Sequence, residues 1–378
     1  MYIHRVIIRG MKNSPDRDLT FYNDWSDEPL HSILITGPNG SGKTTLLRVV
    51  SGLWEAFGLW LANRTTMASR FLSSQGNLFR DIDLVAVEIR DLPDFKDDPV
   101  KKHTLWLYIA RSPEERDKEF KNIEDSQQRV FIGEVRSRGE ARGRLDIRGR
   151  DRQWFEVLAK NLERLSLGIA GDLVPNMIYL DAENRQISSF DKSDAAKERK
   201  VAGEFFYEWL VRYRSSRDET HLETKLRYLA LRDLNKFTSM VQSINLFFGG
   251  EKYLTTDFDS NVRLRVQIGN SPIGNPKNYH YIEDLSSGEK QCLLLVFMVT
   301  RWLMPGGIVL IDEPDLHLHV SLQRQLIATL EQIVKAQNGQ MIVTSHSPTV
   351  WEEYNESQWI SLKDEEWQIT SQETDGNN

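Results

Sequence analysis

A glycine-rich segment at residues 37–44 constrains this chain more than any other feature of its sequence. The apolar run Ser32–Thr36 precedes it, and a helix-like sequence begins at Lys43. Glycines allow such a loop to form a concave nest of N–H groups that binds phosphate, and the helix N-terminus adds positive potential. We therefore predict a strand, a phosphate-binding loop and a helix, the beginning of an α/β fold. The pattern G-x-x-x-x-G-K-[ST] is matched at every position, by Gly37, Pro38, Asn39, Gly40, Ser41, Gly42, Lys43 and Thr44.

The chemistry of this loop indicates a nucleoside triphosphate with its metal ion. Lys43 supplies a compact cation for the β- and γ-phosphates, and the hydroxyl of Thr44 is suited to hold Mg²⁺. The alternative, a glycine-rich turn without a ligand, does not explain why a strand precedes the loop and a helix follows it. We predict ATP and Mg²⁺ as cofactors, with contacts from the whole loop and from Thr45.

Two adjacent acids end a second apolar run. Asp312 and Glu313 follow Ile308–Ile311, and a buried parallel strand delivers its last residues to the carboxyl edge of the sheet, where nucleotides bind. We expect Asp312 to reach the Mg²⁺ shell and Glu313 to act as the general base for the attacking water. Two solvated acids at a strand end are the alternative, and the presence of the phosphate loop favours the catalytic interpretation.

Three histidines near these elements carry weaker signals. His346 follows the apolar run Met341–Thr344, where it can donate a hydrogen bond to the γ-phosphate and help to orient water. A histidine in a loop is also commonly just solvated. His317 and His319 form a pair without a third ligand nearby, so we favour packing at the start of a helix over a metal site.

Composition and charge narrow the class of protein. The chain has 378 residues and a net charge of −7. Because Cys292 is its only cysteine, an intrachain disulfide is excluded and a reducing, cytoplasmic location is expected. Met1–Gly10 reads as a strand and not as a signal peptide. The apolar stretch 292–311 contains Arg301, Pro305 and Gly306, which predict a buried helix, a turn and a strand and argue against a membrane span.

Apolar strands alternating with helices predict a mixed, mainly parallel central sheet flanked by helices. Runs at residues 84–89, 104–109 and 129–135 predict a smaller, partly antiparallel sheet. Residues 195–213 and 222–248 look helical; the apolar stripe of the second indicates core packing or, alternatively, a docking face for a partner. The expected division is one head over residues 1–350, made of an N-terminal lobe (1–75) and a C-terminal lobe (255–350), with a β subdomain (76–190), a helical insertion (191–254) and a C-terminal strand with an acidic tail (351–378).

A further motif carries a family resemblance. Leu285-Ser286-Ser287-Gly288-Glu289 resembles the ABC ATPase signature, normally Leu-Ser-Gly-Gly-Gln, with serine and glutamate at two positions. Phosphate loop, signature, acidic strand and histidine follow in the ABC order. The serine and the glutamate at these two positions, together with residues 312–319, resemble the sequences of the heads of the RecF, SMC and overcoming-lysogenization ATPases. The resemblance covers Met1–Trp60 and Asn278–Pro348.

The resemblance implies an ABC-type head that works as a head-to-tail homodimer or a higher oligomer. Ser286 and Gly288 would cap the γ-phosphate held by the other copy, with Ser287 and Glu289 beside them, and hydrolysis would let the dimer relax. A glutamine that senses Mg²⁺ is also typical of the family, and Gln75 is the candidate.

The length between motifs bears on the biological role that the resemblance implies. The stretch from Lys43 to Leu285 exceeds the helical lobe of a transporter ATPase, and it lacks the heptads of an SMC arm. The segment after His346 is too short for the Toprim nuclease of overcoming-lysogenization proteins. We expect a stand-alone ATPase head that gates a separate effector, such as a nuclease or toxin, in bacterial anti-phage defence or in DNA maintenance and repair. The alternatives are a transporter ATP-binding subunit and a scaffold that holds ATP without turnover.

One basic segment stands apart in this acidic chain. Arg136–Arg152 holds seven arginines against three acids. Such clustering is compatible with a nucleic-acid contact, but no aromatic residues are interleaved to stack on bases. The alternative is a solvated hairpin held by salt bridges.

Overall fold

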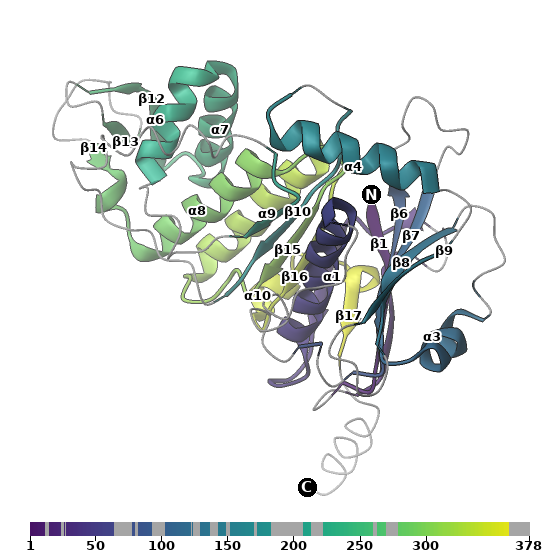
Figure 1. The fold of residues 1–378 in the computed structure, drawn as a ribbon. Coiled ribbons are helices and arrows are strands. Elements are labelled where there is room, and N and C mark those ends of the chain that lie inside the picture. Colours follow the sequence, from purple (N-terminus) through teal and green to yellow (C-terminus); the bar gives the residue numbers. More distant parts are fainter. Residues whose placement is uncertain are drawn as a thin grey trace, which may run out of the picture.

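Two six-stranded sheets, with helices between and around them, form the main body of the described part of the chain (Figure 1). Layers of this kind arise because each sheet and helix must bury its apolar face against another element. The computed structural model describes residues 1–11, 15–23, 26, 28–63, 78–79, 82–92, 103–121, 123, 129–136, 143–148, 152–169, 172–182, 207–212, 222–259, 263–269 and 279–362.

The first sheet is parallel throughout, in the order β11-β10-β15-β16-β5-β17. All residues of its four inner strands are buried, because helices cover both faces of the sheet. The predicted parallel sheet and its strands at both motifs are thus confirmed. Its strands are β5 (Ser32–Thr36), β10 (Met177–Leu180), β11 (Leu210–Arg212), β15 (Ile308–Asp312), β16 (Gln340–Thr344) and β17 (Trp359–Ser361).

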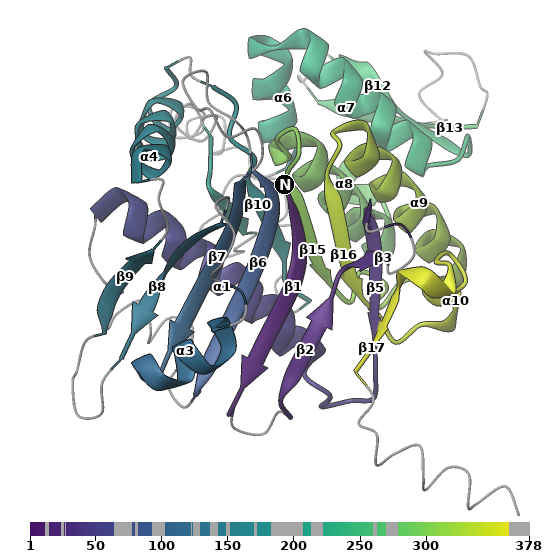
Figure 2. The ribbon, with the colours of Figure 1, turned by 90° about the vertical axis from the view of Figure 1, so that its right-hand side faces the viewer.

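The second sheet has the order β2-β1-β6-β7-β8-β9 and is antiparallel except for the pair β7–β8 (Figure 2). Strands from before the phosphate loop therefore pair with strands that follow it in sequence. α3 (Pro113–Phe120) covers the outer face. The predicted partly antiparallel sheet is confirmed, but it has as many strands as the parallel sheet because β1 and β2 join it. Its strands are β1 (Tyr2–Arg9), β2 (Arg17–Thr20), β6 (Leu84–Leu92), β7 (His103–Ala110), β8 (Arg129–Val135) and β9 (Arg144–Arg148). β3 (Tyr22–Asn23) and β4 (Glu28–Pro29) form a separate pair.

The helix α1 (Lys43–Asn63) lies between the two sheets, and α4 (Arg152–Ser166) packs beside it (Figures 1 and 2). Trp54, Phe57 and Trp60 of α1 are fully buried in one apolar core to which both sheets contribute. Trp209, next to β11, stacks on Trp54 with ring centroids 4.0 Å apart, and each indole N–H donates to the backbone carbonyl of the other residue. Within the described part of the chain, α1 alone has the length and hydropathy of a membrane span, and its burial marks it as a core helix.

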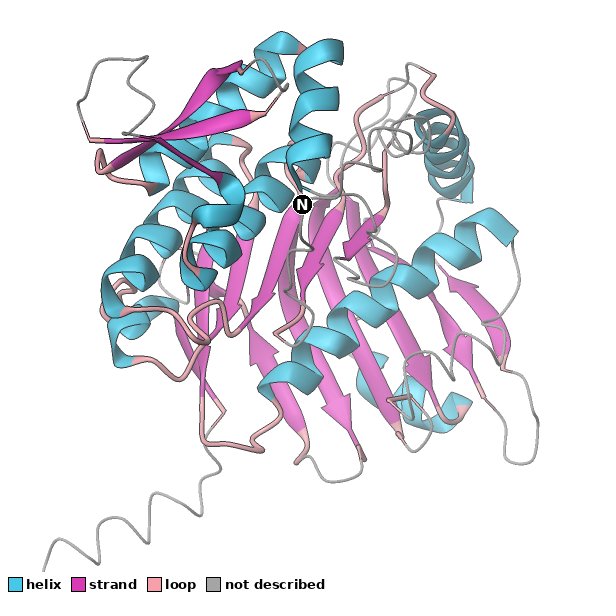
Figure 3. Cartoon of the chain, turned by 90° about the vertical axis from the view of Figure 1, so that its left-hand side faces the viewer, coloured by secondary structure: helices cyan, strands magenta, loops and turns pink. Residues whose placement is uncertain are grey.

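The other face of the parallel sheet is covered by helices that continue into a separate lobe. α8 (Ser287–Trp302) and α9 (Val320–Ala336) pack on the sheet, and beyond them lie α6 (Leu222–Arg232), α7 (Leu234–Phe247) and a three-stranded antiparallel sheet (Figure 3). Phe237, Val241 and Ile244 are buried, so the apolar stripe of α7 is core. The strands of the small sheet are β12 (Lys252–Phe258), β13 (Leu264–Ile268) and β14 (Tyr279–Tyr281).

Two expectations about the helical part are corrected. The helix predicted over residues 222–248 is two helices, because the Asp233 side chain accepts a hydrogen bond from the backbone N–H of Lys236 and begins a new one. The helix predicted over 195–213 is wrong at Leu210–Arg212, which form β11 by pairing with β10. The segment 292–311 is a helix, a turn and a strand, as expected.

The C-terminal part follows the same sheet. α10 (Pro348–Trp351) and a short 3₁₀ turn, Glu356–Gln358, lead into β17, which adds to β5. Of the C-terminal strand and acidic tail expected over residues 351–378, the part after Leu362 lies outside the described residues. The domain boundaries proposed at residues 75, 190 and 254 stay a prediction.

Candidate functional site

The phosphate loop connects β5 to α1 in a backbone conformation that requires glycine. Gly40 and Gly42 have φ angles of 79° and 92°, in the region that residues with a side chain rarely adopt. A Cβ atom on Gly37 would lie 2.6 Å from the Oγ of Ser41, so the loop also lacks space for a side chain at that position. The Oγ of Ser41 is itself buried without a hydrogen-bond partner, which fits a loop shaped to receive phosphate oxygens.

Lys43, the first residue of α1, reaches back into this loop. Its Nζ donates hydrogen bonds to the carbonyl oxygens of Gly37 at 2.9 Å and Pro38 at 3.0 Å. Burial lowers the pKa of Lys43, although the charges of Glu313 and Asp312 act in the opposite direction. A buried ammonium group therefore lies in the loop, close to two carboxylates and placed to bind an anionic ligand.

Asp312 is held by two hydroxyl groups from different elements. Thr44 Oγ1 donates to Asp312 Oδ1 at 3.1 Å, and Thr344 Oγ1 donates to the same oxygen at 2.6 Å. The register of β15 and β16 pairs Asp312 with Thr344, and this pairing brings the two strand ends together. A carboxylate and a hydroxyl side by side fit Mg²⁺, which prefers oxygen ligands and takes the remainder from phosphates and water.

A metal held by protein side chains alone is not indicated at this edge. In the described ranges, no three or more His, Cys, Asp and Glu side chains are grouped as metal ligands. Mg²⁺ usually keeps few protein ligands and completes its coordination with phosphate oxygens and water, which fits the Thr44–Asp312 pair.

Glu313 has a left-handed backbone, with φ of 47°. Two hydrogen bonds hold it there, since its N–H lies 3.0 Å from the carbonyl oxygen of Thr344 and 3.1 Å from Thr344 Oγ1. Strained residues of this kind concentrate at functional sites. The turn directs the Glu313 carboxylate toward His346, with Oε1 3.5 Å from Nε2. Both side chains remain partly accessible, 28% and 37%, so a water molecule can reach them.

Ser286 is the N-cap of α8 and forms a capping box with Glu289. The Ser286 N–H and hydroxyl donate to Glu289 Oε2 at 2.9 and 2.8 Å, and the Glu289 N–H lies 3.3 Å from Ser286 Oγ. Ser287 and Gly288 form the first turn, where Gly288 lies close to Leu318 and Leu322. Within the described part of a single chain, no hydrogen bond joins this helix end to the phosphate loop.

The remaining predicted residues are placed as follows. Pro38, Asn39 and Gly40 are exposed at the loop, and Thr45 is half-buried on α1. His319 is the N-cap of α9, with its Nδ1 near the Ser321 hydroxyl at 3.0 Å, so it begins a helix as expected. Gln75 lies outside the described residues.

Two residues at the site were missed by sequence reasoning. Thr344 joins Asp312 and Glu313, and only its position at the end of an apolar strand could have indicated this role. The Nη2 of Arg17, on β2, donates to the backbone oxygens of Ser41 at 3.1 Å and of Leu362 at 3.3 Å. Arg17 thus connects the phosphate loop to the residue that follows β17. No local pattern in the sequence indicates Arg17.

A family of known proteins matches most of the chain. The family described as "AAA domain, putative AbiEii toxin, Type IV TA system" covers residues 32–352, from the start of β5 to just beyond α10. The chain belongs to this family. The matched range includes the phosphate loop, the signature, the acid pair and His346. With the topology above, the chain has the fold of an ABC-type P-loop ATPase domain.

Curated relatives match only over short segments. The retron Ec83 probable ATPase of Escherichia coli is 48% identical over 77 residues, which are 18% of this chain and 14% of that protein. The Septu protein PtuA of Bacillus thuringiensis is 37% identical over 81 residues, 18% of this chain and 20% of that protein. The matched segments thus span a fifth or less of the length of these relatives.

Solved structures of SMC heads align along nearly the whole chain at low identity. The SMC head bound to the C-winged helix domain of ScpA is 12% identical, covering 96% of this chain and 94% of its own, with a TM-score of 0.47. The SMC head domain from Thermotoga maritima is 13% identical, covering 94% and 93%, with a TM-score of 0.44.

The structure describes part of the arginine-rich segment Arg136–Arg152. Arg148 Nε lies 3.0 Å from Asp146 Oδ2, and Arg136 Nε lies 3.4 Å from Glu134 Oε1. These ion pairs support the interpretation as a salt-bridged hairpin. Arg138, Arg142 and Arg150 lie outside the described residues, so the nucleic-acid contact stays a prediction.

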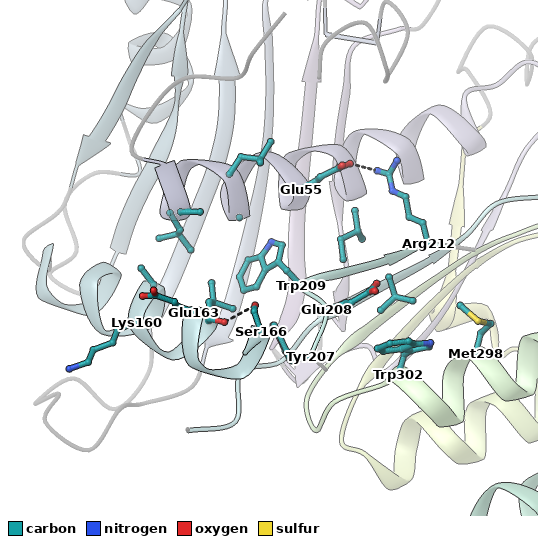
Figure 4. A pocket seen from close by; sticks show the side chains of 18 of the residues that line it. Glu55, Lys160, Glu163, Ser166, Tyr207, Glu208, Trp209, Arg212, Met298 and Trp302 are labelled. Carbon is teal, nitrogen blue, oxygen red and sulfur yellow. Dashed lines mark hydrogen bonds and ion pairs between the residues drawn. The ribbon is translucent and has the colours of Figure 1, made fainter. Parts of the chain in front are cut away.

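A cavity of about 1000 Å³ lies elsewhere in the molecule (Figure 4). It is lined by the second half of α1, by α4, by the edge strand β11 and by Trp302 at the end of α8. Glu55, on its wall, forms an ion pair of 3.0 Å with Arg212. Glu55 is roughly 18 Å along α1 from Lys43, and no predicted site residue lines the cavity. The candidate nucleotide site is therefore the open carboxyl edge of the parallel sheet.

Proposed function

We propose that this chain binds and hydrolyses ATP, with Mg²⁺, as a head-to-tail homodimer that gates a separate effector in the cytoplasm. The observation that carries the proposal is the meeting of Lys43, Thr44, Asp312 and Glu313 at one edge of the parallel sheet. Cation, hydroxyl, carboxylate and general base are the groups that phosphoryl transfer to water requires.

Each side chain has a distinct role in this reaction. The loop N–H groups and Lys43 bind the phosphates, and Thr44 with Asp312 would hold Mg²⁺, which neutralises charge on the phosphate oxygens. Glu313 accepts a proton from the attacking water, and the left-handed turn orients its carboxylate for this purpose. His346 lies beside Glu313 and can donate a hydrogen bond to the γ-phosphate.

The dimer is inferred from the position of the signature helix. Ser286, at the positive end of α8, has an exposed environment and makes no hydrogen bond to the phosphate loop of its own chain, as far as the described residues extend. A second copy can supply the phosphates that this helix end would bind. Each γ-phosphate would then be held between two protomers, so that ATP stabilises the dimer and its hydrolysis releases it.

Substitution of the signature serine separates binding from turnover. Ser286→Arg should bind ATP in its own phosphate loop with unchanged affinity, but it should lose nearly all ATPase activity because the arginine blocks the partner's phosphate. Phosphate release and equilibrium binding of a fluorescent ATP analogue, measured on the same protein, check this result. Full turnover by Ser286→Arg would contradict the composite site.

The effector is inferred from the family and from the printed names of the relatives. A family description that refers to a toxin system, and relatives from retrons and Septu, support a role in anti-phage defence beside a second protein. Co-expression with the products of neighbouring genes should give a complex whose nuclease or toxin activity changes with ATP. If no neighbour associates with the chain in an ATP-dependent way, the gating role is lost while the ATPase activity remains testable.

A further inference from the structure

The signature of this chain has a glutamate where the ABC pattern has glutamine, and the structure gives this residue a partner from another lobe. Glu289 Oε2 accepts both hydrogen bonds from Ser286, and Oε1 lies 2.5 Å from the Nζ of Lys252. Lys252 is the first residue of β12, in the small antiparallel sheet beyond α7. A cation of the lobe is thus linked through a single carboxylate to the serine at the N-terminus of α8.

The charge of Glu289 has two opposite effects at this position. A carboxylate in the first turn of a helix stabilises that helix, but it repels an anion that approaches the helix end from outside. Burial alone would raise the pKa of Glu289, yet hydrogen bonds with Lys252 and Ser286 outweigh it and leave the pKa below its ordinary value. Glu289 is therefore ionised at neutral pH, next to the serine that would receive a triphosphate.

Lys252 compensates this charge at close range. The side chains of Lys252 and Glu289 are only 24% and 15% accessible, so solvent screens their interaction weakly. With Lys252 in contact, the pair is neutral overall, and the positive end of α8 is again attractive to phosphate. A glutamine at position 289 would keep a hydrogen-bond acceptor for Ser286 without any charge, and it would need no lysine.

We propose that Lys252 is a positioning residue that neutralises Glu289, so that the Ser286 end of α8 can receive the phosphates bound by a second copy of this chain. The inference rests on the proposed head-to-tail dimer and adds a residue outside the signature to its composite site. It also makes the site depend on the lobe, because a shift of β12 away from α8 removes the counter-charge from Glu289.

Variants of Lys252, alone and combined with a change of Glu289, test this inference in the Glu313→Gln background. Lys252→Met should raise the ATP concentration for half-maximal dimer formation about tenfold, because Glu289 then faces the incoming phosphate uncompensated. Lys252→Met/Glu289→Gln should recover most of this loss, and Lys252→Arg should retain the dimer. Lys335→Met, at an exposed lysine of α9, is the matched control. Light scattering during gel filtration at graded ATP concentrations measures the dimer.

The outcomes separate this role from a structural one. If the lysine only stabilises the fold, the double variant should form the dimer no better than Lys252→Met, and that result overturns the inference. Dimer formation by Lys252→Met at the ATP concentration of its parent overturns it as well. Binding of a fluorescent ATP analogue to dilute monomer should not change in any variant. If Glu313→Gln itself forms no ATP-dependent dimer, the proposed function and the inference both fall.

Discussion

Lys43→Ala should lose ATP binding almost completely. The Lys43 ammonium lies inside the phosphate loop, 2.9 and 3.0 Å from two loop carbonyl oxygens, where its charge would face the β- and γ-phosphates. Hydrogen bonds to charged groups contribute about 1.5–3 kcal/mol each, so removing this cation should weaken binding on the order of a hundredfold or more. Calorimetric titration with ATP and Mg²⁺ measures the loss.

Thermal unfolding of Lys43→Ala is the control, because it shows whether the substitution affects more than the loop. Because Lys43 also donates to Gly37 and Pro38, its removal can loosen the loop without unfolding the protein. The midpoint of thermal unfolding should therefore stay close to that of the wild type. Wild-type affinity for ATP in Lys43→Ala would show that the nucleotide is not bound by this loop.

Glu313→Gln should retain ATP and accumulate as a dimer. The amide keeps the size and hydrogen-bonding shape of the side chain, but it cannot accept the proton of the attacking water. Loss of a general base typically slows turnover by about 10²- to 10⁴-fold, while nucleotide binding does not require it. Phosphate release should fall by that factor, and gel filtration with ATP should show a species of twice the mass.

A matched glutamate outside the site provides the comparison. Glu331→Gln removes the same charge from α9 and should turn over ATP at the wild-type rate as a transient dimer. If Glu313→Gln hydrolyses ATP as fast as Glu331→Gln, another group is the base, and the role inferred from the left-handed turn at Glu313 is wrong.

The strands that end at the site were predictable because each is a short, continuous apolar segment of the sequence. β5 and β15 are buried on both faces, so each appears as a continuous apolar run, and the chemistry-bearing residues follow immediately. The loop and the acid pair then follow from spacing alone. Long-range pairing could not be predicted in this way. β11 has three residues and becomes a strand only through β10, and Arg17 reaches Ser41 only because β2 joins the second sheet.

The split of the long helix shows the same limit on a smaller scale. The apolar stripe of residues 222–248 correctly predicted helical structure, and Phe237 and Ile244 are buried. Asp233 is exposed and leaves the apolar pattern intact, yet it is the N-cap at which a second helix begins. Hydrophobic periodicity identifies most of the buried side chains here, although Leu234 is 63% exposed. It carries little information on where one helix ends and another begins.

The burial of α1 between two sheets limits how this protein can move. Trp54, Phe57 and Trp60 belong to one core to which both sheets contribute, and the Trp54–Trp209 stack joins the helix to the residue just before the edge strand β11. Tilting α1 alone would open cavities that cost several kcal/mol. We therefore expect the phosphate loop, α1 and both sheets to respond to ATP as one stiff body. In the proposed dimer, any mechanical work would then appear as a displacement of this body against the second copy or against the lobe formed by α6, α7 and the small sheet.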